Sequence, residues 1–165
     1  MKSVQFFVGS PLDGPLLSGT EDLLRLSEIL SQEYPQQEEE ALILFGHGTE
    51  HLTNAVYPAL QTVFHMNARK DVLVGTVEGW PGIEEILQEL KELAVPKVHL
   101  VPMMVVAGDH ACNDMAGQEP DSWKSRLEAA GYQVRCTLSG LGMLGGIQQM
   151  AADHLRESLR TASND

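Results

Sequence analysis

Three residues whose side chains bind metals or take up protons, His47, Glu78 and His110, each stand just after a short apolar run. Neutral imidazole and carboxylate are donors that Co, Ni, Zn and Fe(II) accept. The same groups act as proton acceptors near neutral pH. The three residues therefore predict a three-ligand site for a divalent cation with open coordination positions. For each residue alone, a cap or a loop hydrogen bond is the alternative interpretation.

The apolar runs alternate with amphipathic stretches, which is typical of a parallel sheet covered by helices. Strands are predicted at residues 4–8, 41–45, 72–76, 97–106 and 133–137. Helices are predicted at residues 20–34, 52–66, 82–93, 121–130 and 147–159, with a loop or short helix at 108–117. This order predicts an α/β fold, a doubly wound parallel sheet of about four to five strands with helices on both faces. Ligands of such sheets bind beyond the carboxyl ends of the strands, where the three candidate ligands stand.

The length of 165 residues, with 43% hydrophobic and 21% charged, fits one globular domain. We expect a single lobe over residues 1–160 and a frayed tail at residues 161–165. The net charge of −12 repels nucleic acid and anionic lipid, so neither is expected as a partner. We also expect no membrane span and no signal peptide. Two cysteines outside a C-x-x-C arrangement are typical of a protein in the reducing cytoplasm.

Several other side chains have both a structural and a functional interpretation. His51, four residues after His47, is either a substrate contact or a surface residue. Met103 and Met104 belong first to the core, although this run can also form the floor of an apolar ligand pocket. Cys112 is expected to be a buried free thiol rather than a metal ligand. The histidines expected to have structural or solvated roles are His65, His99 and His154.

Two motif matches suggest other functions. Residues 47–51 match H-x-x-E-H, the helical zinc-binding pattern of the inverzincin metalloproteases, so a zinc hydrolase is an alternative. Its context argues against this function, because His47 directly follows a predicted strand and Gly48 disfavours a helix there. Residues 140–145 match G-x-G-x-x-G, the dinucleotide-binding loop. No strand follows to carry a ribose-binding acid, so we interpret Gly140 and Gly142 as a tight loop where backbone approaches a ligand.

Six segments together resemble the sirohydrochlorin cobaltochelatases of the CbiK type, which share the class II chelatase fold. These segments are residues 46–51, 75–81, 99–110, 113–115, 121–124 and 139–142. The resemblance covers nearly the whole chain, and its specificity comes from several separate motifs in the right order. It implies a lyase of cobalamin biosynthesis that inserts Co(II) into the tetrapyrrole sirohydrochlorin without an organic cofactor. Ni(II), Fe(II) or Zn(II) are expected as other metals in vitro, and a non-catalytic tetrapyrrole or metal carrier is the alternative function.

The resemblance also implies a role for each ligand. The metal-binding residues of the family fall on His47, Glu78 and His110. The enzyme would hold the macrocycle bent, present Co(II) on one face, and remove two pyrrole protons as four nitrogens replace the protein ligands. His47 is the expected proton acceptor, and Glu78 is expected to neutralise metal charge and accept a proton. Asp109 is expected to orient the ring of His110.

Members of this family have two similar α/β lobes with the tetrapyrrole between them, and this chain resembles only the C-terminal lobe. We therefore expect a homodimer or a complex with a separate N-terminal lobe, and a truncated lobe that is folded but inactive is the alternative. Backbone amides of the glycine-rich loop, or cations of the other lobe, would bind the substrate carboxylates that the net charge of −12 repels. The weaker candidates for substrate contacts are His51, Met103, Met104, Gly140 and Gly142.

Overall fold

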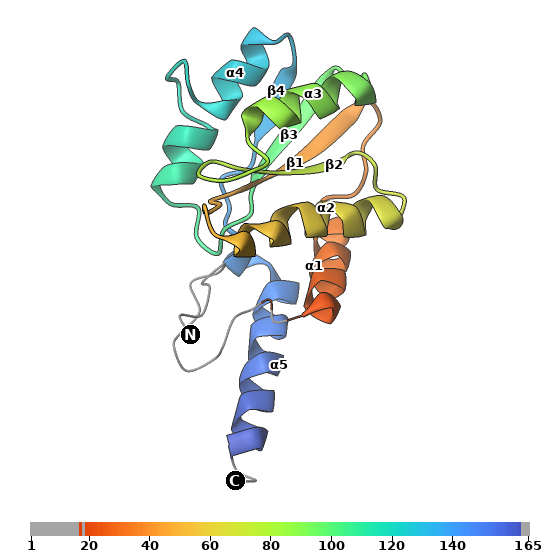
Figure 1. Ribbon diagram of the computed structural model, residues 1–165, viewed down its shortest axis with the longest axis vertical. Coiled ribbons are helices and arrows are strands. Elements are labelled where there is room, and N and C mark those ends of the chain that lie inside the picture. The colour runs from red at the N-terminus through yellow and green to blue at the C-terminus, as the bar shows by residue number, and fades with distance from the viewer. Residues whose placement is uncertain (1–16, 18, 163–165) are drawn as a thin grey trace.

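The computed structural model of the chain describes residue 17 and residues 19–162 (Figure 1). Within these residues four parallel strands form one sheet in the order β2-β1-β3-β4. The strands are β1 (Glu40–Gly46), β2 (Val72–Thr76), β3 (Lys97–Pro102) and β4 (Gln133–Cys136). The strand predicted at residues 4–8 lies outside the described part of the chain. The α/β fold with a parallel sheet is confirmed.

Helices cover both faces of this sheet, as Figure 1 shows. One face carries α1 (Thr20–Glu33), α2 (Val56–Met66) and α5 (Gly145–Ala162), and the other carries α3 (Ile83–Leu93) and α4 (Trp123–Ala129). Successive strand side chains point to opposite faces, so Leu44 packs into the core under the first group of helices, and Ile43 and Phe45 into the second. Because both faces are buried, residues 41–45 of β1 form an unbroken apolar run in the sequence.

β3 ends at Pro102, whereas the sequence predicted a strand through residue 106. Beyond it, the carbonyls of Met104 and Val105 accept hydrogen bonds from the amides of Leu141 and Gly142. The last part of the apolar run therefore pairs with a glycine-rich loop instead of extending the sheet. Hydropathy alone cannot separate these two kinds of apolar segment.

Two predicted elements contain short helical turns of other types. The helix predicted at residues 52–66 begins as a 3-10 turn, Leu52–Ala55, and continues as α2. The segment predicted as a loop or short helix contains a π-helical turn, His110–Met115. π-Helical turns are rare and frequently occur at functional sites, whereas 3-10 turns are common at helix ends. At the C-terminal end, α5 runs to Ala162, two residues into the tail that was predicted to be frayed.

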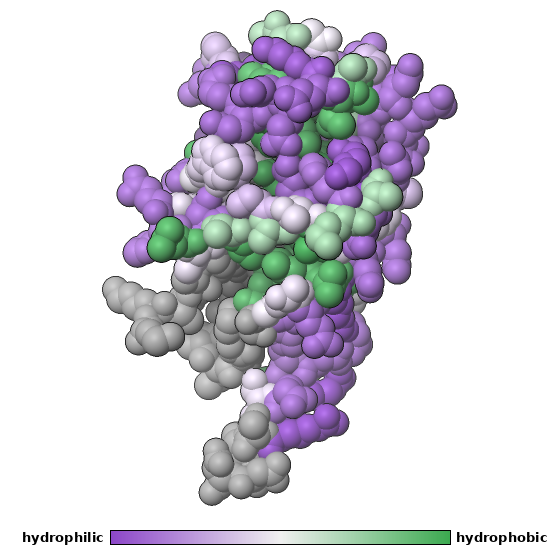
Figure 2. Space-filling view, turned by 45° about the vertical axis from the view of Figure 1, so that its right-hand side comes forward, coloured by the Kyte–Doolittle hydropathy of each residue, from purple (hydrophilic) through white to green (hydrophobic). Residues whose placement is uncertain are grey.

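The surface separates into apolar and polar areas. On the face drawn in Figure 2, hydrophobic side chains gather around the middle of the molecule, and hydrophilic ones cover the upper end and the projecting part of α5. Of the helices in the described residues, none combines the length and the apolar composition that a membrane span requires.

Candidate metal centre

The carboxyl ends of three strands bring His47, Glu78 and His110 together. His47 directly follows β1, Glu78 stands just beyond the end of β2, and His110 follows β3 after a longer loop. One potential ligand atom of each residue lies within 4.8 Å of those of the other two. The three side chains therefore converge at one edge, as their positions after parallel strands predicted.

His47 and Glu78 form the more open side of this cluster. Nδ1 of His47 lies 3.6 Å from Oε2 of Glu78 and 3.1 Å from the carbonyl oxygen of Gly48. When Nδ1 carries the proton and donates to that carbonyl, Nε2 keeps a lone pair for a metal. The exposed fractions of the two side chains are 45% for His47 and 57% for Glu78. An incoming ligand can therefore reach a cation that these residues hold.

His110 lies across the cluster and is oriented by a carboxylate. Its ring meets the ring of His47 edge to face, with the centroids 4.5 Å apart. Its Nδ1 lies 2.5 Å from Oδ2 of Asp114. An ionised carboxylate only accepts, so Nδ1 donates and Nε2 presents its lone pair.

The assignment of this orienting role to Asp109 was wrong. Asp109 is exposed and precedes the π-helical turn, whereas Asp114 lies on the turn and contacts the His110 ring. The four-residue spacing of His110 and Asp114 is the sequence feature that indicates such a contact on a helix. This spacing did not indicate the contact, because residues 108–117 were predicted only as a loop or short helix.

Backbone contacts join the two loops that carry His47 and Glu78. The amide of Glu78 donates to the carbonyl of His47 at 2.8 Å. Gly48 has a positive φ of 82°, and a Cβ at this position would lie 2.6 Å from Cβ of Thr76. Glycine is therefore required here by both conformation and space, and it allows the two ligand loops to approach closely.

Tyr57 of α2 contacts the loop that carries His47. It was not identified from the sequence. Its hydroxyl oxygen accepts a hydrogen bond from the amide of Gly48 at 3.2 Å. Burial raises the pKa of Tyr57, so its hydroxyl stays protonated at neutral pH. In the sequence Tyr57 is one of several apolar positions of an amphipathic helix, and no pattern distinguishes it from the rest of the core.

An open hollow of about 800 Å³ lies beside the cluster and is lined by residues 47–51 and Glu78. His51 lines this hollow and is exposed, so it is accessible to a ligand. Residues 47–49 form a loop rather than a helix, and Glu78 rather than Glu50 lies with His47 and His110. The helical geometry that a zinc hydrolase of the H-x-x-E-H type needs is therefore not formed.

Met103, Met104, Gly140 and Gly142 lie in packing and loop contacts. Met103 is 2% exposed and belongs to the core under α1 and α2, while Met104 packs against the core of the other face. A Cβ at Gly140 would lie 2.8 Å from the amide nitrogen of Ala107. The amide of Gly142 already donates to a backbone carbonyl at 2.9 Å, so it is not available to a substrate carboxylate.

The remaining histidines make contacts within the protein. Their partners are the carbonyl of Val72 for His65, the hydroxyl of Thr137 for His99 and the carboxylate of Asp22 for His154.

The prediction of a buried thiol at Cys112 was wrong, because this residue is exposed. Ala111 and Met115 of the same π-helical turn are the ones that pack into the core, and Cys112 lies between them on the outer side.

Known proteins similar to this chain support one family. The sequence profile described as cobalt chelatase (CbiK) matches residues 4–160. The sirohydrochlorin cobaltochelatase of Salmonella typhimurium (strain LT2) is 39% identical over 158 residues, covering 94% of this chain and 59% of that protein. The sirohydrochlorin cobaltochelatase CbiKC of Nitratidesulfovibrio vulgaris (strain Hildenborough) is 36% identical over 151 residues, covering 90% of this chain and 53% of that protein. The chain thus spans little more than half the length of these curated relatives, and it belongs to the cobalt chelatase (CbiK) family.

Proposed function

We propose that this chain is the metal-binding lobe of a sirohydrochlorin cobaltochelatase. Such an enzyme is a lyase that inserts Co(II) into sirohydrochlorin for cobalamin biosynthesis. The observation that carries the proposal is the convergence of His47, Glu78 and His110. The names of both relatives, sirohydrochlorin cobaltochelatase, support the same reaction. Because the chain spans little more than half the length of these relatives, the complete activity is part of the proposal.

In this mechanism Co(II) is the metal substrate and binds first to the two imidazoles and the carboxylate. Glu78 offsets part of the charge of the cation, and its exposed position lets it release the metal. As the pyrrole nitrogens replace the protein ligands, His47 accepts one of the two departing protons and Glu78 the other. The same donors accept Ni(II), Fe(II) and Zn(II), so a preference for Co(II) is a further part of the proposal.

Exposed apolar side chains stand in the chain segments next to the three ligands and suit an apolar macrocycle. Leu52, Trp80 and Val106 are 95%, 61% and 73% exposed. Trp80 and Val106 stand in the loops of Glu78 and His110, and Leu52 begins the 3-10 turn that follows the loop of His47. Apolar and aromatic surface of this kind is what binding sites for ring systems present. We propose that the tetrapyrrole lies against these side chains.

The loops at this edge do not supply cations for the carboxylates of sirohydrochlorin. Residues 46–54, 77–82, 103–117 and 138–144 contain no lysine or arginine, but they contain four acidic residues, Glu50, Glu78, Asp109 and Asp114. We propose that a second lobe closes the cleft and carries the basic side chains. A second copy of this chain would bring two sets of acidic loops together, which repulsion opposes.

The experiment that tests this function is an absorbance assay of Co(II) insertion into sirohydrochlorin, with the oligomeric mass measured by sedimentation on the same sample. Repeated turnover supports the chelatase, and stoichiometric binding without turnover supports the carrier. A strict monomer that turns over repeatedly would contradict the need for a second lobe.

The cytoplasmic location is likewise a prediction, and the free thiols of Cys112 and Cys136 support it.

A further inference from the structure

The side chain of Asn54 connects the two loops that carry His47 and Glu78. Asn54 lies in the 3-10 turn before α2 and is 9% exposed. Its Oδ1 accepts a hydrogen bond from the amide of Thr49 at 2.9 Å, and its Nδ2 donates to the carbonyl of Trp80. Thr49 follows His47 closely in one loop, and Trp80 follows Glu78 closely in the other. One buried amide therefore spans both ligand loops.

The two partners of Asn54 allow only one kind of side chain. A backbone N–H can only donate and a carbonyl can only accept, so Oδ1 must face Thr49 and Nδ2 must face Trp80. An aspartate of the same shape would keep the bond from Thr49 but would place a carboxylate oxygen against the carbonyl of Trp80. Leaving a buried polar group without its partner is costly. The asparagine side chain therefore satisfies the hydrogen-bonding groups of both loops, whereas an aspartate would satisfy only that of Thr49.

The packing around this amide shows that the loops are in direct contact there. A Cβ at Gly79 would collide with Oδ1 of Asn54 and would lie 3.0 Å from the amide nitrogen of Thr49. We propose that Asn54 is a positioning residue, which holds the loops of His47 and Glu78 at the separation that lets both side chains bind one cation. This inference rests on the metal site proposed above. In the sequence, Asn54 is one of several polar residues inside a predicted helix, without a pattern that indicates this role.

The test compares Asn54→Asp with a matched control, Gln61→Glu. Gln61 of α2 makes the same kind of bridge, because its Oε1 accepts from the amide of Val74 at 2.7 Å and its Nε2 donates to Glu89 at 2.6 Å. Both variants replace a bridging amide by a carboxylate and add one negative charge. Titration of the metal-free chain with Co(II), followed by absorbance, should show about 10- to 100-fold weaker binding in Asn54→Asp. Gln61→Glu should bind Co(II) within about 3-fold of the wild-type chain.

The charge change makes this comparison sharp. A carboxylate added near the site would by itself strengthen cation binding, so weaker binding in Asn54→Asp supports positioning over electrostatics. Equal or tighter binding in the folded variant overturns the inference. Denaturant unfolding and circular dichroism on both variants show whether they are folded. If Asn54→Asp does not fold, Gly79→Ala disturbs the same contact without a charge, and unchanged Co(II) binding there overturns the inference.

A second readout does not depend on metal. Amide hydrogen exchange in the metal-free chain should accelerate about 10-fold or more at Glu78, whose amide joins the two loops, in Asn54→Asp but not in Gln61→Glu. Unchanged exchange at Glu78 overturns the inference. If the wild-type chain binds no Co(II), the proposed metal site fails, and the exchange rates alone decide whether Asn54 holds the two loops together.

Discussion

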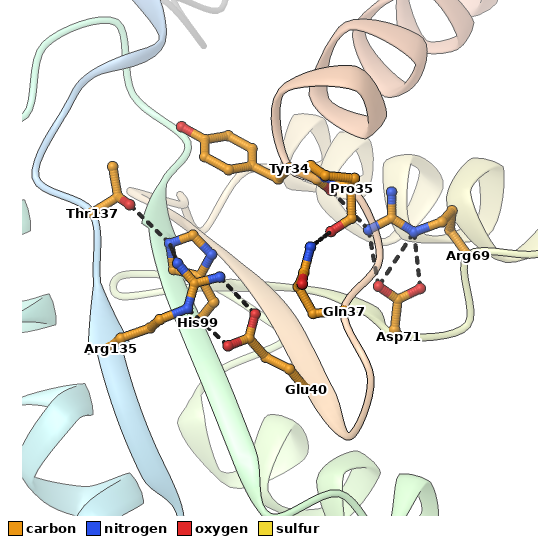
Figure 3. Close-up of polar contacts among 9 residues, drawn as sticks. All are labelled: Tyr34, Pro35, Gln37, Glu40, Arg69, Asp71, His99, Arg135 and Thr137. Atoms are coloured by element: carbon orange, nitrogen blue, oxygen red, sulfur yellow. Dashed lines mark hydrogen bonds and ion pairs between the residues drawn. The ribbon is translucent and has the colours of Figure 1, made fainter.

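The end of the sheet where the strands begin, here called the amino edge, and the end where they finish, the carboxyl edge, both carry histidine beside carboxylate. The two ends arrange these groups differently. At the amino edge, shown in Figure 3, Nε2 of His99 lies 2.8 Å from the hydroxyl of Thr137 and 3.3 Å from Nη1 of Arg135. The ring is packed edge to face against Tyr34, with centroids 5.6 Å apart, and His99 is 4% exposed. At the carboxyl edge, His47 and Glu78 are about half exposed.

The charged side chains also have different partners at the two edges. Glu40 accepts two hydrogen bonds from Arg135, at 2.6 and 2.8 Å, and these bonds lower the pKa of Glu40. Burial, and then the Arg135 guanidinium, lower the pKa of His99 to about 4, so this ring is neutral at pH 7. The carboxyl edge places two imidazoles and a carboxylate together with no cation from its loops. No lysine or arginine of these loops pairs with Glu78, whereas at the amino edge Arg135 pairs with Glu40.

The comparison shows that residue type does not by itself identify a ligand site. The hollow at the amino edge has a volume of about 110 Å³, against about 800 Å³ at the carboxyl edge. Within the described residues, no buried side-chain nitrogen or oxygen lacks a hydrogen-bond partner. Polar groups that bind one another hold the amino edge together, whereas His47 and Glu78 at the carboxyl edge remain about half exposed. The following variants test this division.

The largest effect is expected from removing a metal-binding imidazole. His47→Ala and His110→Ala should each weaken Co(II) binding by about 100-fold or more, because loss of a ligand exceeds the cost of losing its supporting contact. His99→Ala is the matched control from the other edge and should bind Co(II) within about 3-fold of the wild-type chain. Titration followed by absorbance measures all three. Unchanged affinity for Co(II) in both His47→Ala and His110→Ala would contradict the proposed metal site.

The two glutamates beside the hollow should differ. Glu78→Gln should weaken Co(II) binding by about 100-fold, because it removes an anionic ligand from the cluster, and insertion of Co(II) should fall with it. Glu50→Gln removes the same charge from the neighbouring loop and should change the affinity by less than about 3-fold. The reverse ranking would favour the hydrolase that uses Glu50.

The amino edge should show its effect in the pH dependence of stability. The pKa of His99 lies at about 4 in the folded chain and at 6.5 without burial, so the unfolded chain takes up the proton first. His99 therefore leaves stability unchanged above about pH 6.5 and lowers it as the pH falls toward about 4. The loss is roughly 2 kcal/mol at about pH 5.

His99→Gln tests this effect, because glutamine keeps an acceptor for Thr137 and Arg135 but cannot titrate. Urea unfolding at about pH 7 and about pH 5 should show a smaller drop in stability for the variant than for the wild-type chain. The depressed pKa of Glu40 matters only below its ordinary value of 4.5, so it does not contribute in this range. Equal drops in both proteins would refute the assignment to His99.

The smallest effect is expected from the carboxylate that orients His110. Asp114→Asn should weaken Co(II) binding by about 10-fold, because the amide no longer fixes the proton on Nδ1. Nitrogen NMR of the His110 ring in the metal-free chain should then show a mixture of tautomers instead of the Nδ1-protonated form. Asp109→Asn, the exposed neighbour, is the control and should change neither measurement. A single unchanged tautomer in Asp114→Asn would contradict the orienting role.

Most of the fold was predictable because it depends on local periodicity. The unbroken apolar run of β1 indicated a strand buried on both faces, and its end at Gly46 placed His47 at the carboxyl edge. The ends of elements were less predictable. Residues 103–106 are at least as apolar as β3, and only the pairing of Met104 and Val105 with the loop at Gly142 shows that the chain leaves the sheet there.

The sequence by itself determined the alternation of strands and helices, the three candidate ligands and the family of the chain. Only the tertiary structure decided which groups support those ligands. Asn54, Tyr57 and Asp114 act through contacts with loops or rings that their sequence neighbours do not specify. Apolar periodicity is a property of each segment alone, so the sequence shows it directly. A hydrogen bond between two loops depends on the distance and polarity that folding brings about, and therefore appears only when the strands are placed side by side.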